Sequence, residues 1–225
     1  MNPLLKLPKV SLNSFFLGVA SGFSAALILP EFGEAYYKLS LVQAERLKAV
    51  FAGASWNVWL TLTIYLRNVA IALLLAIIPL ALVYHAIAYR KRYPFKSGDF
   101  SQKLIDEIRL TLTLYSISTL FAYGFVVFGL FLAFVFVENS FSGLIRWTLY
   151  LMPHGVLETF SMISAASTGI IIREKWLRDF DVRSFSFWKQ IPRRDYATYL
   201  LLLSIVLFIS ALLEVYVSTG LMQLV

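Results

Sequence analysis

The hydrophobic residues of the chain gather into five long runs, separated by connectors that hold most of the charged residues. An α-helix needs about 20 apolar residues to cross a bilayer, and these runs approach or exceed that length. The alternating segments of about ten residues that build transmembrane β-barrels are not found. We therefore predict an all-α, polytopic membrane bundle of about five transmembrane helices. They are expected over residues 11–29, 68–88, 110–137, 144–172 and 196–217.

Composition supports a membrane class. The 225 residues are 59% hydrophobic with a mean hydropathy of +0.74, whereas soluble domains are about half apolar. No connector is long enough for a separate soluble domain, so residues 1–225 are predicted to form a single integral membrane domain. The run over 11–29, with small residues Ser24 to Ala26, also fits a signal peptide, which is the alternative to a first membrane helix.

The connectors carry helical patterns of their own. In the connector over 31–56 the apolar residues approximate a helical stripe, which fits an amphipathic interfacial helix or a plain hairpin packed on its neighbours. The connector over 98–109 has helix-start candidates in Asp99 and Ser101. The connector over 178–196 mixes aromatic and basic residues, as expected at a membrane interface.

The basic residues indicate an orientation. Of the 20 lysines and arginines, 15 fall before the first run or in the second and fourth connectors, which lie on one side of the membrane. The positive-inside rule then predicts a cell-membrane protein with a cytoplasmic N-terminus and an external C-terminus. The net charge of +7 is explained by anionic lipid at the bilayer surface. No nucleic-acid partner is expected, because no basic face interleaved with aromatic residues lies on a soluble domain.

The fourth run contains the stretch LYLMPHGVLETF, residues 149–160, in which ionisable residues interrupt an apolar sequence. Proline favours the first turn of a helix and disrupts a helix interior. A helix restarting at Pro153 would span the membrane over 153–172, with 141–152 as a short interfacial or re-entrant piece. One continuous kinked helix is the alternative.

His154 and Glu158 are spaced i, i+4 and share a helix face. Ser161, Ala165 and Gly169 continue that stripe with the small-residue spacing that lets membrane helices approach closely. The ionisable pair is therefore expected to face protein at the end of a helix-packing seam. The seam meets either the second or fifth run of the same chain or a second copy in a homo-oligomer.

Depth along the helices groups the polar residues. At about 1.5 Å per residue from the inner helix ends, Glu158 lies about 21 Å up, and His154 and Glu214 about 27 and 26 Å up. Arg67 and Asn68 lie about 30 Å up. We predict that these five residues form a polar cluster near the outer leaflet, with Arg67 pairing Glu158 or Glu214 and the cluster serving either as a structural lock or as an ion-handling site.

The sequence offers no complete catalytic or metal-binding set. Zinc requires at least three protein ligands, whereas His154 and Glu158 supply two and His85 lies about 26 Å deeper than Asn68. There is no cysteine. No GxSxG motif surrounds Ser161 or Ser164. We therefore expect no catalytic residues, no metal and no cofactor, with an intramembrane hydrolase as the least favoured alternative.

The stretch PHGVLETFSMISAASTGI, residues 153–170, resembles the signature of the stage II sporulation protein M family, which has Pro-His-Gly, two variable residues and then Glu. The stretch YLRNVAIALLLAIIP, residues 65–79, resembles the family's Asn-containing second helix start. The resemblance maps onto Pro153, His154, Gly155, Glu158 and Asn68. Two departures are that Arg67 stands where many members have a second Asn, and that residues 76–79 lack the glycines of many members.

The resemblance implies a multi-pass plasma-membrane protein. The protein after which the family is named resembles a membrane scaffold, which holds peptidoglycan-cleaving partners at the septum of spore-forming cells. Three functions follow as hypotheses. The first is a non-enzymatic scaffold or anchor for membrane or envelope proteins. The second is a transporter or permease-like subunit that handles an ion or proton at His154 and Glu158. The third is the intramembrane hydrolase.

Overall fold

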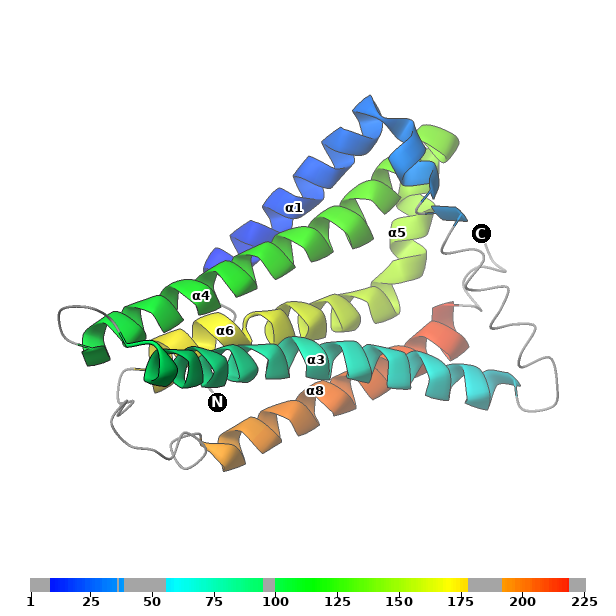
Figure 1. Ribbon diagram of the computed structural model, residues 1–225. Coiled ribbons are helices and arrows are strands. Elements are labelled where there is room, and N and C mark those ends of the chain that lie inside the picture. The colour runs from blue at the N-terminus through cyan, green and yellow to red at the C-terminus, as the bar shows by residue number, and fades with distance from the viewer. Residues whose placement is uncertain (1–8, 36, 39–55, 95–99, 178–191, 219–225) are drawn as a thin grey trace.

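The computed structural model describes residues 9–35, 37–38, 56–94, 100–177 and 192–218, and within them every regular element is helical (Figure 1). The elements are α1 (Lys9–Ile28), α3 (Trp56–Arg92), α4 (Phe100–Tyr123), the π-helical η2 (Gly124–Leu130), α5 (Phe131–Ala166), α6 (Thr168–Ile171), the π-helical η3 (Ile172–Trp176), α8 (Arg193–Leu213) and the π-helical η4 (Glu214–Ser218).

Four helical stretches of the described chain are long and apolar enough to cross a membrane, namely Lys9–Ile28, Val58–Arg92, Phe100–Glu138 and Arg193–Val217. A fifth span is formed if the bent pair Leu151–Ala166 and Thr168–Trp176, which meet at 46°, counts as one crossing. The all-α membrane bundle of about five helices is therefore confirmed. Several stretches extend beyond the predicted ranges, because the helical backbone continues into the polar residues outside the apolar window.

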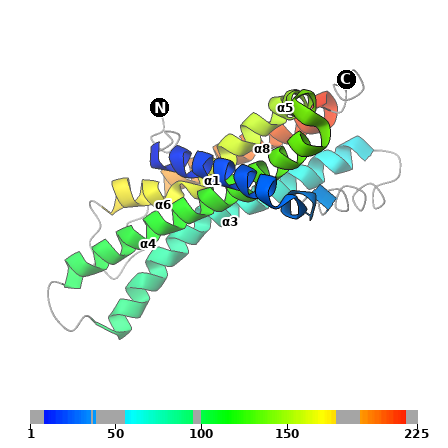
Figure 2. The ribbon, with the colours of Figure 1, turned by 90° about the horizontal axis from the view of Figure 1, so that it is seen from above.

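The second and third spans are much longer than a bilayer requires. At about 1.5 Å per residue, stretches of 35 and 39 residues measure roughly 50–60 Å against a hydrocarbon core of about 30 Å. α3 and α4 run antiparallel and lie side by side (Figure 2), and their joined ends carry a two-pronged ion pair. Arg90 Nε lies 2.7 Å from Glu107 Oε2, and Nη2 lies 3.0 Å from Oε1.

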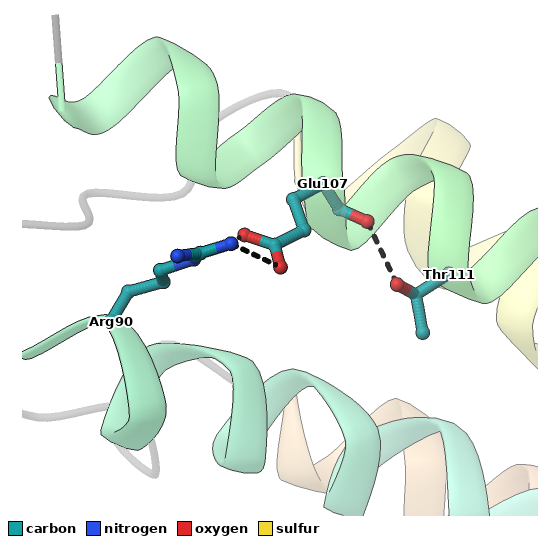
Figure 3. Close-up of polar contacts among 3 residues, drawn as sticks. All are labelled: Arg90, Glu107 and Thr111. Carbon is teal, nitrogen blue, oxygen red and sulfur yellow. Dashed lines mark hydrogen bonds and ion pairs between the residues drawn. The ribbon is translucent and has the colours of Figure 1, made fainter. Parts of the chain in front are cut away.

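Figure 3 shows how α4 supports this ion pair. Glu107 projects from α4 toward Arg90 at the end of α3, and the Thr111 hydroxyl donates to the Glu107 carbonyl oxygen at 2.9 Å. Four segments meet at this end of the bundle, which we name the basic end. They are the N-terminal part of α4, the C-terminal part of α3, η3 and the start of α8. The described basic residues of this end include Arg90, Lys91, Arg92, Lys103, Arg109, Arg173, Lys175, Arg193 and Arg194.

α1 runs parallel to α4 and η2, and glycines bring their backbones together. A Cβ atom on Gly18 or Gly22 would overlap the carbonyl groups of Phe121 and Phe125. A Cβ atom on Gly129 would lie 2.7 Å from the Gly22 Cα atom. This glycine contact was not predicted, although Gly18 and Gly22 have the small-xxx-small spacing of close membrane helix pairs.

The core of the bundle lies among α3, α4, α5 and α8, and Pro79 explains one of its polar contacts. Proline has no N–H, so the carbonyl of Leu75, four residues earlier in α3, has no helical donor. The Tyr115 hydroxyl of α4 donates to that carbonyl at 2.7 Å. The Tyr196 hydroxyl of α8 donates to the neighbouring Ala76 carbonyl. Two tyrosines thus join α4 and α8 to α3 next to Pro79.

α5 changes direction along its length, descending from the η2 end and then turning into the row of α3 and α8 (Figure 1). Its backbone leaves helical geometry at Ser140, where φ is 60° and ψ is −167°. The membrane-spanning piece begins at Leu151, two residues before Pro153. Residues 141–166 stay helical through Pro153, because one missing hydrogen bond bends a helix without ending it. The spanning piece thus begins within two residues of the predicted restart at Pro153, while the backbone runs through the proline as in the kinked-helix alternative.

Two predicted connectors cannot be followed in full. The connector over 178–196 lies outside the described residues up to position 191, and the connector over 31–56 lies outside them for most of its length. The described first helix starts near the basic end and α8 finishes at the opposite end, since Tyr196 of α8 packs on Trp176 of η3. The side of the membrane on which each end lies remains a prediction.

Candidate functional site

The ionisable residues of the bundle meet where α3, α5 and the junction of α8 and η4 come together. Arg67 Nη2 of α3 lies 4.0 Å from Glu158 Oε1 of α5. Arg67 Nε donates to Asn68 Oδ1 at 2.9 Å. Glu214 interacts electrostatically with both Glu158 and Arg67. We name Arg67, Asn68, His154, Glu158 and Glu214 the polar cluster.

Burial in the polar cluster is graded. Asn68 and His154 are 1% and 4% exposed, and the Glu158 side chain is 24% exposed. The Arg67 side chain is half exposed. An arginine can lay its apolar stem along a helix while its guanidinium reaches toward water. Arg67 is therefore the member of the cluster that opens toward the surface, and the other charges lie behind it.

His154 joins the polar cluster to α8 through its backbone. The Ser210 hydroxyl donates to the His154 carbonyl oxygen at 3.0 Å. Ser210 and Glu214 are spaced i, i+4, so α8 presents both to α5 on one face. Ser210 was not singled out in the sequence, and its spacing from Glu214 was the available signal.

The other two motif residues are placed differently. Pro153 and Gly155 are each partly exposed. A Cβ atom on Gly155 would meet nothing nearer than the Leu151 Cβ atom at 3.6 Å. Gly155 lines an apolar groove of about 500 Å³ that is bordered by α1, α5 and η2. The structure thus brings five predicted residues together and leaves Pro153 and Gly155 without a comparable tight contact.

Two buried polar atoms at the cluster have no hydrogen-bond partner among the described residues. They are Glu214 Oε2 and Ser161 Oγ. A buried polar group without a partner costs about 1–3 kcal/mol, and such groups are uncommon in folded proteins. These atoms give the cluster unused hydrogen-bonding capacity of both donor and acceptor type.

The predicted seam is fully buried. Ser161, Ala165 and Gly169 are all inaccessible to solvent, and a Cβ atom on Gly169 would lie 2.6 Å from Ser116 Oγ and 2.7 Å from the Leu112 carbonyl oxygen. Gly169 therefore packs within the chain and against α4. The expected neighbours were the second or fifth run or a second copy, so this partner was not anticipated.

A line of hydroxyl groups continues from the polar cluster into the bundle. Ser161, Ser164 and Thr168 follow Glu158 at helical spacing and are fully buried. Ser164 Oγ lies 3.1 Å from the Tyr199 hydroxyl, which lies 3.5 Å from Thr168 Oγ1. Tyr199 was not predicted to belong to a site, because only the docking of α8 on α5 makes it a neighbour of the serines.

Metal ligands are sparse in the part of the chain that the structure describes. There, no three His, Cys, Asp or Glu side chains lie close enough together to hold an ion. His85 is exposed on α3 and lies 17 residues beyond Asn68 along the same helix. His85 and His154 therefore belong to different parts of the bundle.

The fold and the polar cluster define a multi-pass α-helical membrane protein with ionisable residues held between its helices. The chain belongs to the stage II sporulation protein M family, whose model matches residues 11–219. Pro153, His154, Gly155, Glu158 and Asn68 all lie within the matched range. Comparisons with curated proteins and with solved structures give no significant match.

Proposed function

We propose that this protein is a non-enzymatic membrane scaffold or anchor that holds other membrane or envelope proteins in the cell membrane, with its N-terminus in the cytoplasm. The observation that carries this proposal is that polar residues of the family motif make contacts between helices. Glu158 is paired with Arg67, and the His154 carbonyl is bonded to Ser210. Both contacts join helices of the same chain, which supports a role in fixing the bundle.

A scaffold also needs a surface for its partners. Five large apolar residues of α5 are at least 46% exposed and lie on one helix face at spacings of three or four positions. They are Phe141, Ile145, Leu149, Met152 and Val156. An exposed apolar stripe on a membrane protein contacts either lipid or another protein. We propose that α5 uses this stripe for a partner protein.

Photo-crosslinking in native membranes tests this proposal. A photoreactive residue is placed at Ile145 or Met152, and matched controls carry it at Leu201 or Ile205, which are exposed on α8. The same partner protein should be crosslinked from both α5 positions, and reverse purification through that partner should recover the scaffold. Crosslinks to lipid alone at all four positions, together with purification of the chain without a partner, would contradict the scaffold.

Ion or proton handling is the second candidate. It is supported by the unpartnered Ser161 Oγ and Glu214 Oε2 atoms, and by the hydroxyl groups of Ser164, Thr168 and Tyr199 that continue the line. Ionisable residues within membrane helices commonly mark ion or proton paths.

Proteoliposomes that contain a pH-sensitive dye separate the two candidates. A conducting path predicts proton flux that Glu158→Gln reduces at least about tenfold, while Arg146→Gln, an exposed position, leaves it unchanged. Flux no greater than that of protein-free liposomes removes this candidate and leaves the scaffold unaffected.

A further inference from the structure

The basic end contains a polar pocket that lies far along the helices from the polar cluster. It has a volume of about 620 Å³ and is lined by Arg109, Leu110 and Thr113 of α4 together with Arg173 and Glu174 of η3. Neither the sequence motifs nor the proposed function uses these residues. We name this hollow the arginine pocket.

The guanidinium of Arg173 is held in place across two helices. Arg173 Nη1 donates to Thr113 Oγ1 at 2.9 Å. Thr113 Oγ1 in turn donates to the Arg109 carbonyl oxygen at 2.7 Å. The Arg173 side chain remains 35% exposed. A planar guanidinium that is positioned in advance loses little entropy on binding and suits the oxygens of a phosphate.

The arginine pocket presents two guanidiniums, each beside one carboxylate. Glu174 belongs to the lining, and Asp106 lies next to Arg109 just outside it. Arg173 Nη2 lies 3.3 Å from Glu174 Oε1, and Arg109 Nη1 lies 3.5 Å from Asp106 Oδ1. Exposed pairs of this kind are worth about 0–1 kcal/mol, so a phosphate can compete with these carboxylates for the guanidiniums.

An apolar track on the same helix starts at the pocket. Leu110 lines it and is 61% exposed, and Leu114, one turn further along α4, is 56% exposed. Both lie within the Phe100–Glu138 membrane-spanning stretch. An acyl chain can therefore lie along Leu110 and Leu114 while its headgroup meets the arginines, which favours a lipid over a soluble phosphate.

We propose that the arginine pocket binds the phosphodiester headgroup of a membrane phospholipid. Arg109 and Arg173 donate to the phosphate oxygens, Thr113 fixes Arg173, and Leu110 and Leu114 contact the acyl chain. Basic pockets between membrane helices near the cytoplasmic surface commonly bind anionic lipid headgroups. The site is independent of whether the protein acts as a scaffold or handles an ion.

Native mass spectrometry of the detergent-purified full chain tests the site. The probes are phosphatidylglycerol, phosphatidylcholine and a diacylglycerol with the same acyl chains but no phosphate, and inorganic phosphate is added as a competitor. The expected order is phosphatidylglycerol tightest and diacylglycerol at least about tenfold weaker. Arg109→Gln and Arg173→Gln should each weaken phosphatidylglycerol binding about tenfold, whereas Arg146→Gln should not.

A second variant separates binding from misfolding. Arg173→Lys keeps the charge but loses the planar fork that reaches Thr113, so it should bind phosphatidylglycerol with intermediate affinity at an unchanged melting temperature. Equal binding of phosphatidylglycerol and diacylglycerol, or equal losses in Arg146→Gln and Arg173→Gln, would overturn the proposal. Displacement of the lipid by millimolar inorganic phosphate would make this a soluble-phosphate site and overturn the lipid assignment.

Discussion

Arg67 of α3 and Glu158 of α5 approach to 4.0 Å between Nη2 and Oε1, and this ion pair joins two residues that are 91 positions apart in the sequence. Glu214, the first residue of η4, lies close enough to be attracted by Arg67 and repelled by Glu158. Glu158 of the family motif thus lies where α3, α5 and η4 come together. The predictions below test that junction and the packing around it.

The packing of Gly169 leaves no room for a side chain. Gly169→Ala should lower the free energy of unfolding by about 1–3 kcal/mol, because overfilled contacts force backbone shifts, and the added Cβ would meet Ser116 Oγ and the Leu112 carbonyl. Gly155→Ala is the matched control, since a Cβ atom there would make only an ordinary contact, 3.6 Å from the Leu151 Cβ atom. It should be neutral or stabilise the helix by up to about 1 kcal/mol. Equal losses from the two variants in a denaturation titration would refute the tight contact.

Tyr199 connects α8 to the hydroxyl line of α5 and α6. Tyr199→Phe removes the hydroxyl that bonds Ser164 and approaches Thr168. It should lower the free energy of unfolding by about 0.5–1.5 kcal/mol, as expected for a hydrogen bond within a membrane bundle. Tyr216→Phe, at an exposed position, should change it by less than about 0.5 kcal/mol. No difference between the variants would mean that the Tyr199 hydroxyl makes no net contribution.

Ser140 has a backbone conformation that suits glycine. With φ of 60° and ψ of −167°, it occupies a region that costs a non-glycine residue about 1–3 kcal/mol. Ser140→Gly should therefore raise the melting temperature. Ser142→Gly is a strict control, because both variants remove the same 3.3 Å contact between the two hydroxyls but Ser142 is helical. Ser142→Gly should lower the stability by about 0.5–1 kcal/mol.

The Arg90–Glu107 pair should contribute more than a simple surface pair. It has two short contacts and partly buried side chains. A double-mutant cycle with Arg90→Gln and Glu107→Gln should give a favourable coupling that shrinks in high salt. The exposed Asp106–Arg109 pair should give less than about 0.5 kcal/mol in the same cycle. Similar couplings for the two pairs would argue against a special role for the two-pronged geometry.

The membrane spans and the polar cluster could be predicted because both follow from distances along single helices. Apolar length fixes a span, and a rise of about 1.5 Å per residue places Arg67, Glu158 and Glu214 at one depth. Antiparallel packing of α5 and α8 then suffices to bring their polar residues together.

Other features depend on how helices rotate and approach, which periodicity does not define. The Tyr115 hydroxyl reaches the Leu75 carbonyl because α4 lies against α3 beside Pro79. Gly22 and Gly129 meet because α1 packs on a π-helical segment that the sequence pattern does not predict. The arginine pocket needs Arg173 to lie beside Thr113, although 60 residues separate them. The break in α5 lies at Ser140, which has no proline or glycine to mark it.

The most direct test of the structural role of the polar cluster is a double-mutant cycle on Arg67→Gln and Glu158→Gln, with the free energy of unfolding measured in a lipid bilayer. The structure predicts a favourable coupling of about 0.5–1.5 kcal/mol, within the range of polar contacts between membrane helices. It also predicts that Arg146→Gln shows no coupling with Glu158→Gln. A coupling of zero between Arg67 and Glu158 would contradict the account that this pair locks α3 to α5.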